Sequence, residues 1–268
     1  MRRVRTQQIL TCRILKITLL KQSMEYKAEK VTPYGSDESK TQQVQEMFDS
    51  IAPAYDFMNR AMTFGIDKIW RRIAVGKLKG KPINSILDVA TGTGDLAFLL
   101  SKKIKPRKIN AIDLSEGMLS IAREKSAKKG INNITFETGN CLDLKYADNS
   151  FDAITVAYGV RNFEHLDKGY QEMYRVAAKG ASVCIIELST PTNPFALALY
   201  KVYTRAIIPT IGRLVSHDRR AYTYLPESIA AVPQGKQMLQ IMQKAGFKNC
   251  RHYPLTFGVC TIYIGEKL

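Results

Sequence analysis

The stretch Ser85-Ile-Leu-Asp-Val-Ala-Thr-Gly-Thr-Gly-Asp95 decides the fold, because it combines a buried strand, a sharp turn and the start of a helix. Its apolar run, residues 86–90, is typical of a parallel strand that is covered on both faces. Gly92 and Gly94 let the backbone approach a ligand closely, and the free amides that open the following helix would face that ligand. A second apolar run ends at Asp113, nineteen residues beyond Gly94, where a carboxylate can accept both hydroxyls of a ribose.

The turn itself distinguishes between nucleotide ligands. It lacks the third glycine of a dinucleotide fingerprint and is closed by an acid, Asp95. A carboxylate beside the turn suits an ammonium group better than a pyrophosphate, and the amino acid end of S-adenosylmethionine carries such an ammonium. The alternative is that Gly92 and Gly94 only make a tight strand-to-helix turn. Because a strand, a turn, a helix, a second strand and a terminal acid follow in register, the sequence predicts a site for S-adenosylmethionine.

Length and cysteine content narrow the class of protein. The 268 residues suit one large α/β domain. Five cysteines are widely spaced, odd in number and form no C-x-x-C pair, so we expect neither a metal site nor a disulfide framework, and a cytoplasmic location. No apolar run reaches the roughly 18–20 residues of a membrane span.

The net charge of +16 divides unevenly along the chain. Residues 1–23 hold six basic residues and no acid; they are either an over-called start or a basic helix on a membrane surface. We expect residues 1–40 to form a flexible basic and polar extension, and residues 41–268 to form a single domain. Lysines of the domain, such as Lys125, are expected on solvent-facing sides of helices, so the charge alone does not select a nucleic acid as partner.

Apolar periodicity predicts the elements of the domain. Helical patterns at 41–51 and 66–73 flank an irregular aromatic-rich segment, 55–65, and we expect residues 41–80 to lie on the substrate side. Helices are predicted at 95–103 and 115–130, and another begins near Leu166 and is stopped by Gly180. The first five strands are predicted at residues 85–90, 109–113, 133–138, 151–157 and 182–188.

The C-terminal region completes the predicted fold. After a helix at 234–245, two β-like runs at 249–255 and 259–265 are so close that they must pair antiparallel. The chain therefore predicts a Rossmann-like α/β methyltransferase fold, in which a seven-stranded, mostly parallel sheet ends in an antiparallel pair and carries helices on both faces. The insertion 189–233 leaves the carboxyl end of a strand and is expected to form an apolar lid over the second substrate, with ordinary helix packing as the alternative.

Six motifs resemble those of the C-methyltransferases of menaquinone and ubiquinone biosynthesis. They occur in that family's order and spacing from about Val44 to the C-terminus. Thr63 replaces a serine that is usual in the family, and Asp67 replaces a frequent histidine. The motifs are YDFMNRAMTFGIDKIW, LDVATGTGD, AIDLSEGML, AYGVRN, IIELSTP and YTYLPESI.

The resemblance implies a set of cofactor-binding residues. Thr93 and the backbone of Gly92 and Gly94 would hold the methionine end of S-adenosylmethionine, and Asp113 would hold the ribose. Asn140 and Cys141 would flank the adenine, where the Asn140 amide can pair with the adenine amino group and ring nitrogen. For Cys141, a purely structural role as a small buried residue is the alternative.

The resemblance also implies how the reaction is catalysed. A hydroquinone carbon becomes nucleophilic next to an ionised oxygen, and a cation beside that oxygen favours the anion. Arg161 would stabilise this phenolate while water takes the proton, and Asn162 would orient the ring. Tyr55, Asp56 and Asn59 would close the site from the N-terminal side. The alternative bases are His165 and His217.

The implied activity is methylation of a polyprenylated demethylmenaquinol in menaquinone biosynthesis, with the benzoquinol of ubiquinone biosynthesis as the alternative. Peripheral contact with the inner membrane surface and a homodimer are compatible with the sequence. A nucleic-acid methyltransferase would show an Asn-Pro-Pro-aromatic loop or a Pro-Cys nucleophile, but residues 157–162 read AYGVRN, so we expect no nucleic acid partner. A non-catalytic nucleotide-binding module would need neither the YDFMN segment nor the apolar insertion.

Overall fold

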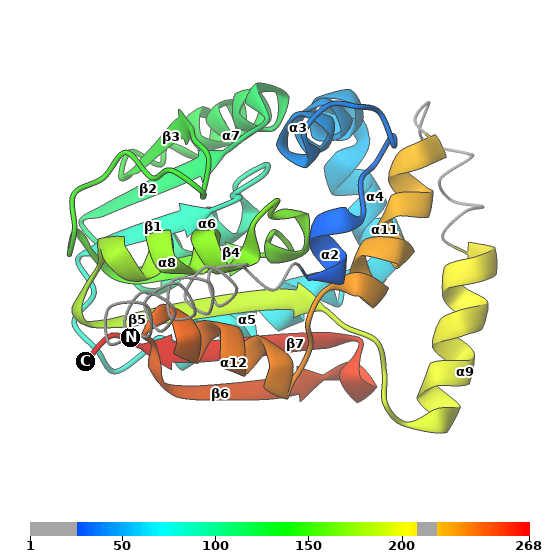
Figure 1. The fold of residues 1–268 in the computed structure, drawn as a ribbon. Coiled ribbons are helices and arrows are strands. Elements are labelled where there is room, and N and C mark those ends of the chain that lie inside the picture. Colours follow the sequence, from blue (N-terminus) through cyan, green and yellow to red (C-terminus); the bar gives the residue numbers. More distant parts are fainter. Residues whose placement is uncertain (1–25, 208–218) are drawn as a thin grey trace, which may run out of the picture.

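The computed structural model describes residues 26–207 and 219–268, which fold around one sheet (Figure 1). The strand order is β3-β2-β1-β4-β5-β7-β6. Neighbours from β3 to β5 pair in parallel, whereas β7 pairs antiparallel with both β5 and β6. This arrangement confirms the predicted sheet. The strands are β1 (Ser85–Val89), β2 (Lys108–Asp113), β3 (Ile134–Thr138), β4 (Phe151–Ala157), β5 (Ala177–Leu188), β6 (Lys248–Leu255) and β7 (Cys260–Glu266).

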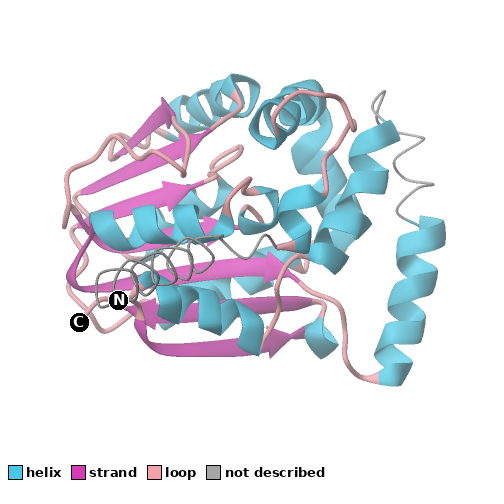
Figure 2. Ribbon diagram, in the orientation of Figure 1, coloured by secondary structure: helices cyan, strands magenta, loops and turns pink. Residues whose placement is uncertain are grey.

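Helices cover both faces of the sheet because its central strands are apolar on both sides (Figure 2). Side chains alternate along β1, so Ile86 belongs to the core under one face and Leu87 to the core under the other. The Ile86 face packs on α5 (Asp67–Lys77) and α6 (Asp95–Lys103). The Leu87 face packs on α8 and α12, while α7 lies along β2 and β3. These three helices are α7 (Glu116–Lys129), α8 (Leu166–Val176) and α12 (Lys236–Ala245).

One predicted boundary is wrong. The helix that we expected to stop at Gly180 ends at Val176, and the chain passes directly into β5. Gly180 lies within that strand at φ +85°, where the pairing of β4 with β5 shifts register. The Gly180 N–H donates to the carbonyl of Lys267 and the Lys267 N–H donates to that of Ala181. A tertiary contact with the end of the chain therefore decides the conformation of this segment.

A layer of helices lies beyond the carboxyl ends of the parallel strands (Figure 1). The segment 55–65, which we expected to be irregular, is mostly helical. In chain order the layer contains α3 (Lys40–Ile51), the 3-10 turn η1 (Ala52–Ala54), α4 (Tyr55–Thr63), α9 (Pro194–Val202), the π-helix η3 (Tyr203–Ile207) and α11 (Arg219–Ala231). Side chains from α3, α4 and α11 share a core of Val44, Met47, Met58, Ala221, Tyr222 and Tyr224. The insertion thus supplies α9 and α11, and its residues 208–218 lie outside the described residues.

The second half of the expected N-terminal extension packs against the domain. Tyr26, which precedes α2 (Lys27–Lys30), donates a hydrogen bond of 2.9 Å from its hydroxyl to Asp167. Lys40 is buried and donates to the carbonyls of Ala28 and Arg161. Burial lowers the pKa of Lys40 to about 8. The expectations for residues 1–23 fall outside the described part of the chain.

Across residues 26–207 and 219–268, no helix combines the length and apolar character needed to cross a membrane.

Candidate active site

The turn after β1 is held in an unusual backbone conformation. Ala90, Gly92 and Gly94 all have positive φ, at 52°, 56° and 83°. A Cβ on Gly94 would lie 3.0 Å from the ring of Phe98, so both backbone and space demand glycine there. The Gly92 N–H donates to Asp113 Oδ2 at 2.7 Å, which joins the turn to the end of β2. The predicted strand–turn–helix unit therefore places Asp113 directly beside the turn.

Four of the predicted cofactor residues line one small pocket of about 60 Å³. These four are Gly92, Asp113, Asn140 and Cys141. Asp113 also accepts a bond from the Ser115 N–H at 3.0 Å, and each carboxylate oxygen keeps a further acceptor position. Burial raises the pKa of Asp113, and the backbone N–H groups of Ser115, Gly92 and Leu114 oppose this effect. An anchored carboxylate, an amide and apolar walls match the chemical groups of an adenine nucleoside, and a pocket of about 60 Å³ would have to widen to admit one.

Thr93, Gly94 and Asp56 do not line this pocket. The Thr93 hydroxyl donates to Asp56 at 2.5 Å, and Lys125 Nζ lies 2.9 Å from Asp56 and 2.6 Å from Asp95. Lys125, which we expected on a solvent-facing side, is only 19% exposed. Asp56 therefore belongs to a charged network around the turn, and it does not line the large cavity where we expected it to close the site.

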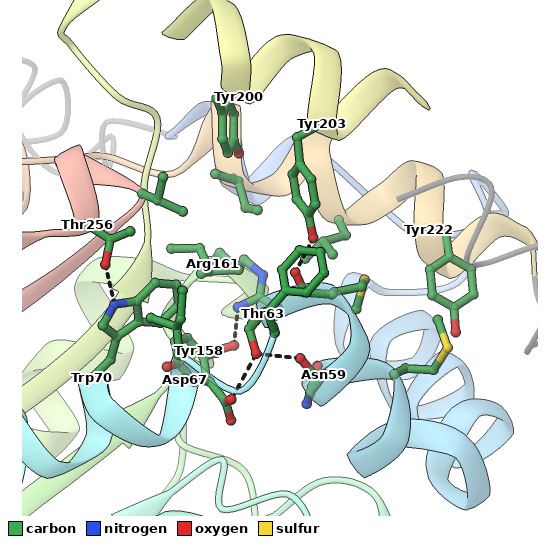
Figure 3. A pocket seen from close by; sticks show the side chains of 18 of the residues that line it. Asn59, Thr63, Asp67, Trp70, Tyr158, Arg161, Tyr200, Tyr203, Tyr222 and Thr256 are labelled. Carbon is green, nitrogen blue, oxygen red and sulfur yellow. Dashed lines mark hydrogen bonds between the residues drawn. The ribbon is translucent and has the colours of Figure 1, made fainter. Parts of the chain in front are cut away.

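An apolar cavity of about 640 Å³ adjoins the small pocket. Its walls come from α3, α4, α5, α9 and α11, from the loop after β4 and from the 3-10 turn η4 (Thr256–Gly258). Phe48, Tyr55 and Tyr158 line both the cavity and the small pocket, so the two are neighbours. Figure 3 shows Arg161 and Tyr158 across the cavity from Tyr200 and Tyr203. Its volume falls within the range of sites for organic ligands.

Arg161 is the central polar group of the cavity wall. It lies in η2 (Val160–Asn162), and its side chain is 7% exposed. Its Nη1 donates to Glu187 Oε1 at 2.8 Å and to the carbonyl of Tyr158, whereas its buried Nε has no hydrogen-bond partner among the described residues. Burial acts to lower the pKa of Arg161, but Glu187 together with Tyr55 and Tyr224 outweighs it and the pKa is raised. Arg161 is thus a permanent cation with an unused donor.

The neighbours of Arg161 include two other predicted residues. Asn162 lines the small pocket and accepts a bond of 3.0 Å from the Tyr224 hydroxyl. Tyr55 lines both spaces, and burial raises its pKa. The structure therefore brings Arg161, Asn162 and Tyr55 to the boundary between the cavity and the small pocket.

Sequence reasoning missed several polar residues that the fold buries here. Glu187 is 1% exposed and pairs with Arg161. Asp67 and Arg71 form a second buried ion pair in the cavity wall. An acid inside the apolar strand IIEL was one available signal, because buried carboxylates are rare unless paired. The sequence also shows Asp67 and Arg71 four residues apart on a predicted helix, the spacing of an ion pair. That spacing does not tell whether the pair lies on the buried or on the exposed face of the helix.

Of the two histidines considered as bases, only His165 can be placed, and it lies away from the site. His165 is exposed at the start of α8 and lines neither the cavity nor the small pocket, and His217 lies outside the described residues. In the described part of the chain, no cluster of histidine, cysteine or acidic side chains is arranged to hold a metal ion.

Comparisons with known proteins agree with this geometry. The demethylmenaquinone methyltransferase of Bacteroides fragilis is 46% identical over 245 residues, which cover 91% of this chain and all of that relative. The ubiquinone/menaquinone biosynthesis C-methyltransferase UbiE of Geotalea daltonii is 44% identical over 85% of this chain and 97% of that relative. A crystal structure of a SAM-dependent methyltransferase from Aquifex aeolicus has the same fold, with a TM-score of 0.55 at 21% identity over 74% of this chain and 89% of that chain.

The family model described as the ubiE/COQ5 methyltransferase family matches residues 36–267. The matched range includes the turn after β1, Asp113, Arg161 and every described wall of the cavity. The resemblance seen in the six motifs is confirmed, and the chain belongs to the ubiE/COQ5 methyltransferase family.

Proposed function

We propose that this protein methylates a ring carbon of a polyprenylated demethylmenaquinol, using S-adenosylmethionine as the donor. The observation that carries the proposal is the position of Arg161. Its side chain lies in the wall of an apolar cavity of about 640 Å³, next to a pocket with the donors and acceptors of a nucleoside site. The naphthoquinol is favoured over a benzoquinol because the relative from Bacteroides fragilis is named for demethylmenaquinone.

When bound, S-adenosylmethionine would supply a methyl group that is already activated by its sulfonium charge. Asp113 would hold the ribose, Asn140 and Cys141 would flank the adenine, and the turn at Gly92–Gly94 would carry the methionine end. Thr93 would act there indirectly, because its hydroxyl is bonded to Asp56. The protein's task is to align the acceptor carbon, exclude water and make that carbon nucleophilic.

Arg161 would favour the phenolate form of the quinol. A free phenol has a pKa near 10, and a cation in a site of low polarity lowers that value. The Nε, which has no partner among the described residues, gives Arg161 a donor for the oxygen, while Glu187 holds the guanidinium through Nη1. Since arginine remains protonated in proteins, the proton from the phenol would leave to water.

The prenyl tail would leave the cavity past α9. Phe64, Phe195 and Phe257 all line the cavity and are 76%, 74% and 84% exposed. Large exposed aromatic side chains around an opening are typical of contact with lipid or with an apolar ligand. We therefore propose a cytoplasmic protein whose cavity mouth rests on the membrane surface that holds the quinol.

Substitutions on α9 should affect long-tailed substrates selectively. Phe195 and Leu199 lie one turn apart and both line the cavity. Changing both to serine should raise the Michaelis constant for a long-tailed quinol at least tenfold, since each buried CH₂ contributes roughly 0.8 kcal/mol. The Michaelis constant for a tail-less quinol should stay within about threefold. Val202→Ser is the matched control, because Val202 is 63% exposed on the same helix but does not line the cavity. Equal losses on both substrates at unchanged thermal stability would place the tail elsewhere.

The function is tested by two measurements on the purified protein. Isothermal titration should show binding of S-adenosylmethionine, and a methyl-transfer assay should show turnover with reduced demethylmenaquinone. Turnover with a demethylated benzoquinol but not with the naphthoquinol would assign the ubiquinone reaction instead. Binding of the donor without transfer to either quinol would contradict the proposal.

A further inference from the structure

A second polar cluster lies in the cavity wall beside Arg161. It consists of Thr63 in α4, Asp67 and Arg71 in α5, and Tyr158 after β4. Figure 3 labels three of these residues, Thr63, Asp67 and Tyr158. Asp67 and Arg71 are 3% and 7% exposed, and they form an ion pair. The Arg71 guanidinium stands 5.3 Å from the centre of the Tyr158 ring. Because Arg161 donates to the carbonyl of Tyr158, the two polar sites are neighbours on one wall.

The hydrogen bonds within this cluster leave specific groups unused. Within residues 26–207 and 219–268, two buried side-chain polar atoms have no hydrogen-bond partner, namely Tyr158 Oη and Arg161 Nε. Both belong to residues that line the cavity. Buried polar groups in proteins are normally paired, and an unpaired one calls for an explanation. Neither atom is exposed to the cavity, so a ligand that offers two separate polar atoms would pair with both only after a small shift of the side chains that cover them.

Asp67 also keeps capacity for a further partner. Its Oδ1 lies 2.8 Å from the Thr63 hydroxyl, whose single proton has a second acceptor at 2.7 Å in the carbonyl of Asn59. Its Oδ2 accepts from Arg71. An ionised carboxylate has about four lone-pair positions, so at least two remain. The cluster thus offers an acceptor in Asp67 and a donor in Tyr158.

The backbone at Tyr158 is constrained so that this side chain is held in the wall. Tyr158 has φ +60°, which is uncommon for a large side chain. The next residue, Gly159, could not carry a Cβ, because that atom would lie 2.6 Å from Ala90 Cβ. The Tyr158 N–H donates to the carbonyl of Ile186 at 2.7 Å. Strained positions of this kind cluster at functional sites.

We propose that Asp67 and Tyr158 bind the second ring hydroxyl of the quinol, at the far end of the ring from the oxygen held by Arg161. This inference rests on the proposed function. A hydroquinone carries two hydroxyls on opposite sides of its ring, and the cavity wall carries two polar sites. The second hydroxyl donates to the Asp67 carboxylate and accepts from the Tyr158 hydroxyl. Two anchors fix the rotation of the ring, and therefore which carbon faces the methyl donor.

The same arrangement discriminates between reduced and oxidised substrates. A quinol hydroxyl can donate to Asp67. A quinone carbonyl cannot, because the carbonyl oxygen and the carboxylate are both acceptors and would repel each other. Arg71, the ion-pair partner of Asp67, also lies near the turn after β1, because its Nη1 is 3.9 Å from Asp95 Oδ2 at the start of α6. Asp67 and Tyr158 are therefore positioning residues that select the reduced ring.

The decisive variant is Tyr158→Phe, which removes a hydroxyl that has no hydrogen-bond partner in the described part of the chain. Its methyl-transfer kinetics are measured on two prenylated substrates, a 1,4-naphthalenediol and the naphthol that keeps only the hydroxyl next to the reacting carbon. We expect the wild-type protein to have a lower Michaelis constant for the diol than for the naphthol. Tyr158→Phe should raise the Michaelis constant for the diol about tenfold and leave that for the naphthol unchanged. Tyr203→Phe is the control; it lines the cavity but bonds to the carbonyl of Met62, so it should affect both substrates alike.

A second variant covers the carboxylate. In Asp67→Asn the new amide can donate to a quinone carbonyl. Oxidised demethylmenaquinone should therefore inhibit this variant at a concentration at least tenfold lower than the one that inhibits the wild-type protein. If Tyr158→Phe keeps the wild-type preference for the diol, or if Asp67→Asn folds normally and is inhibited by the quinone like wild type, the second anchor is wrong. If wild type methylates neither substrate, the proposed function itself fails, which is a distinct result.

Discussion

Replacing Arg161 by alanine is expected to lower the turnover number by about 10²–10³ while changing the dissociation constant of S-adenosylmethionine only a few-fold. The loss follows from removing one preorganised group that stabilises a developing anion. Because Arg161 lines the large cavity and not the small pocket, the donor site should be nearly unaffected. Single-turnover methyl transfer and isothermal titration measure the two effects separately.

The pH dependence should change in a defined direction. Without the cation, the pKa of the bound phenol rises toward its solution value, so the rate of Arg161→Ala should continue to climb at pH values where wild type has levelled off. Arg161→Lys keeps the charge without the planar fork and should recover only part of the rate. An alanine variant that keeps its turnover number and loses only donor affinity would rule out the phenolate role.

Stability must be measured alongside this variant. Arg161 is the ion-pair partner of Glu187, whose side chain is 1% exposed. Removing one member of a buried pair leaves an uncompensated charge and costs roughly 3–5 kcal/mol. The double variant, Arg161→Ala together with Glu187→Gln, lacks both charges. It should therefore regain stability without regaining turnover. Recovery of turnover in the double variant would mean that Arg161 acts only through folding.

Replacing Asp113 by alanine is expected to weaken binding of S-adenosylmethionine by at least about a hundredfold. Two charge-assisted bonds to ribose hydroxyls contribute about 1.5–3 kcal/mol each. The alanine also loses the bonds from the Gly92 and Ser115 N–H groups, so the turn itself will loosen. Isothermal titration measures the combined loss.

Asp49→Ala is the matched control for this loss of backbone bonds. Asp49 accepts from the Ser115 hydroxyl and the Gly117 N–H at the start of α7, but it does not line the small pocket. The affinity of the Asp49→Ala variant for S-adenosylmethionine should stay within about threefold of the wild-type value. A dissociation constant for Asp113→Ala within a factor of two of wild type would rule out the ribose assignment.

Much of the fold was predictable because local signals and tertiary packing agree. The runs that end at Val89 and Asp113 are short and apolar, and such runs bounded by turns become buried strands. The last two strands were predictable from the short connection between them, which permits only antiparallel pairing. Gly180 shows the limit, since a glycine commonly ends a helix but here lies in a strand that pairs with Lys267.

The candidate site was predictable to a smaller extent. Gly92, Asp113 and Arg161 follow strands at their carboxyl ends, and parallel strands bring those ends together. Asp56 could not be placed, because the direction of its side chain depends on Lys125 reaching across from another helix. Asp67 could not be recognised as buried, since a charged side chain enters a core only when the fold supplies a partner, here Arg71.

The most direct test follows the methyl group itself. Purified protein is incubated with S-adenosylmethionine that carries an isotope-labelled methyl group and with chemically reduced demethylmenaquinone, and the extracted quinones are analysed by mass spectrometry. We expect a labelled methyl group on the naphthoquinone ring, formed with the reduced substrate and absent from reactions with the oxidised quinone. Binding of the donor with no label on the ring, or label on the prenyl tail or on a ring oxygen, would contradict it.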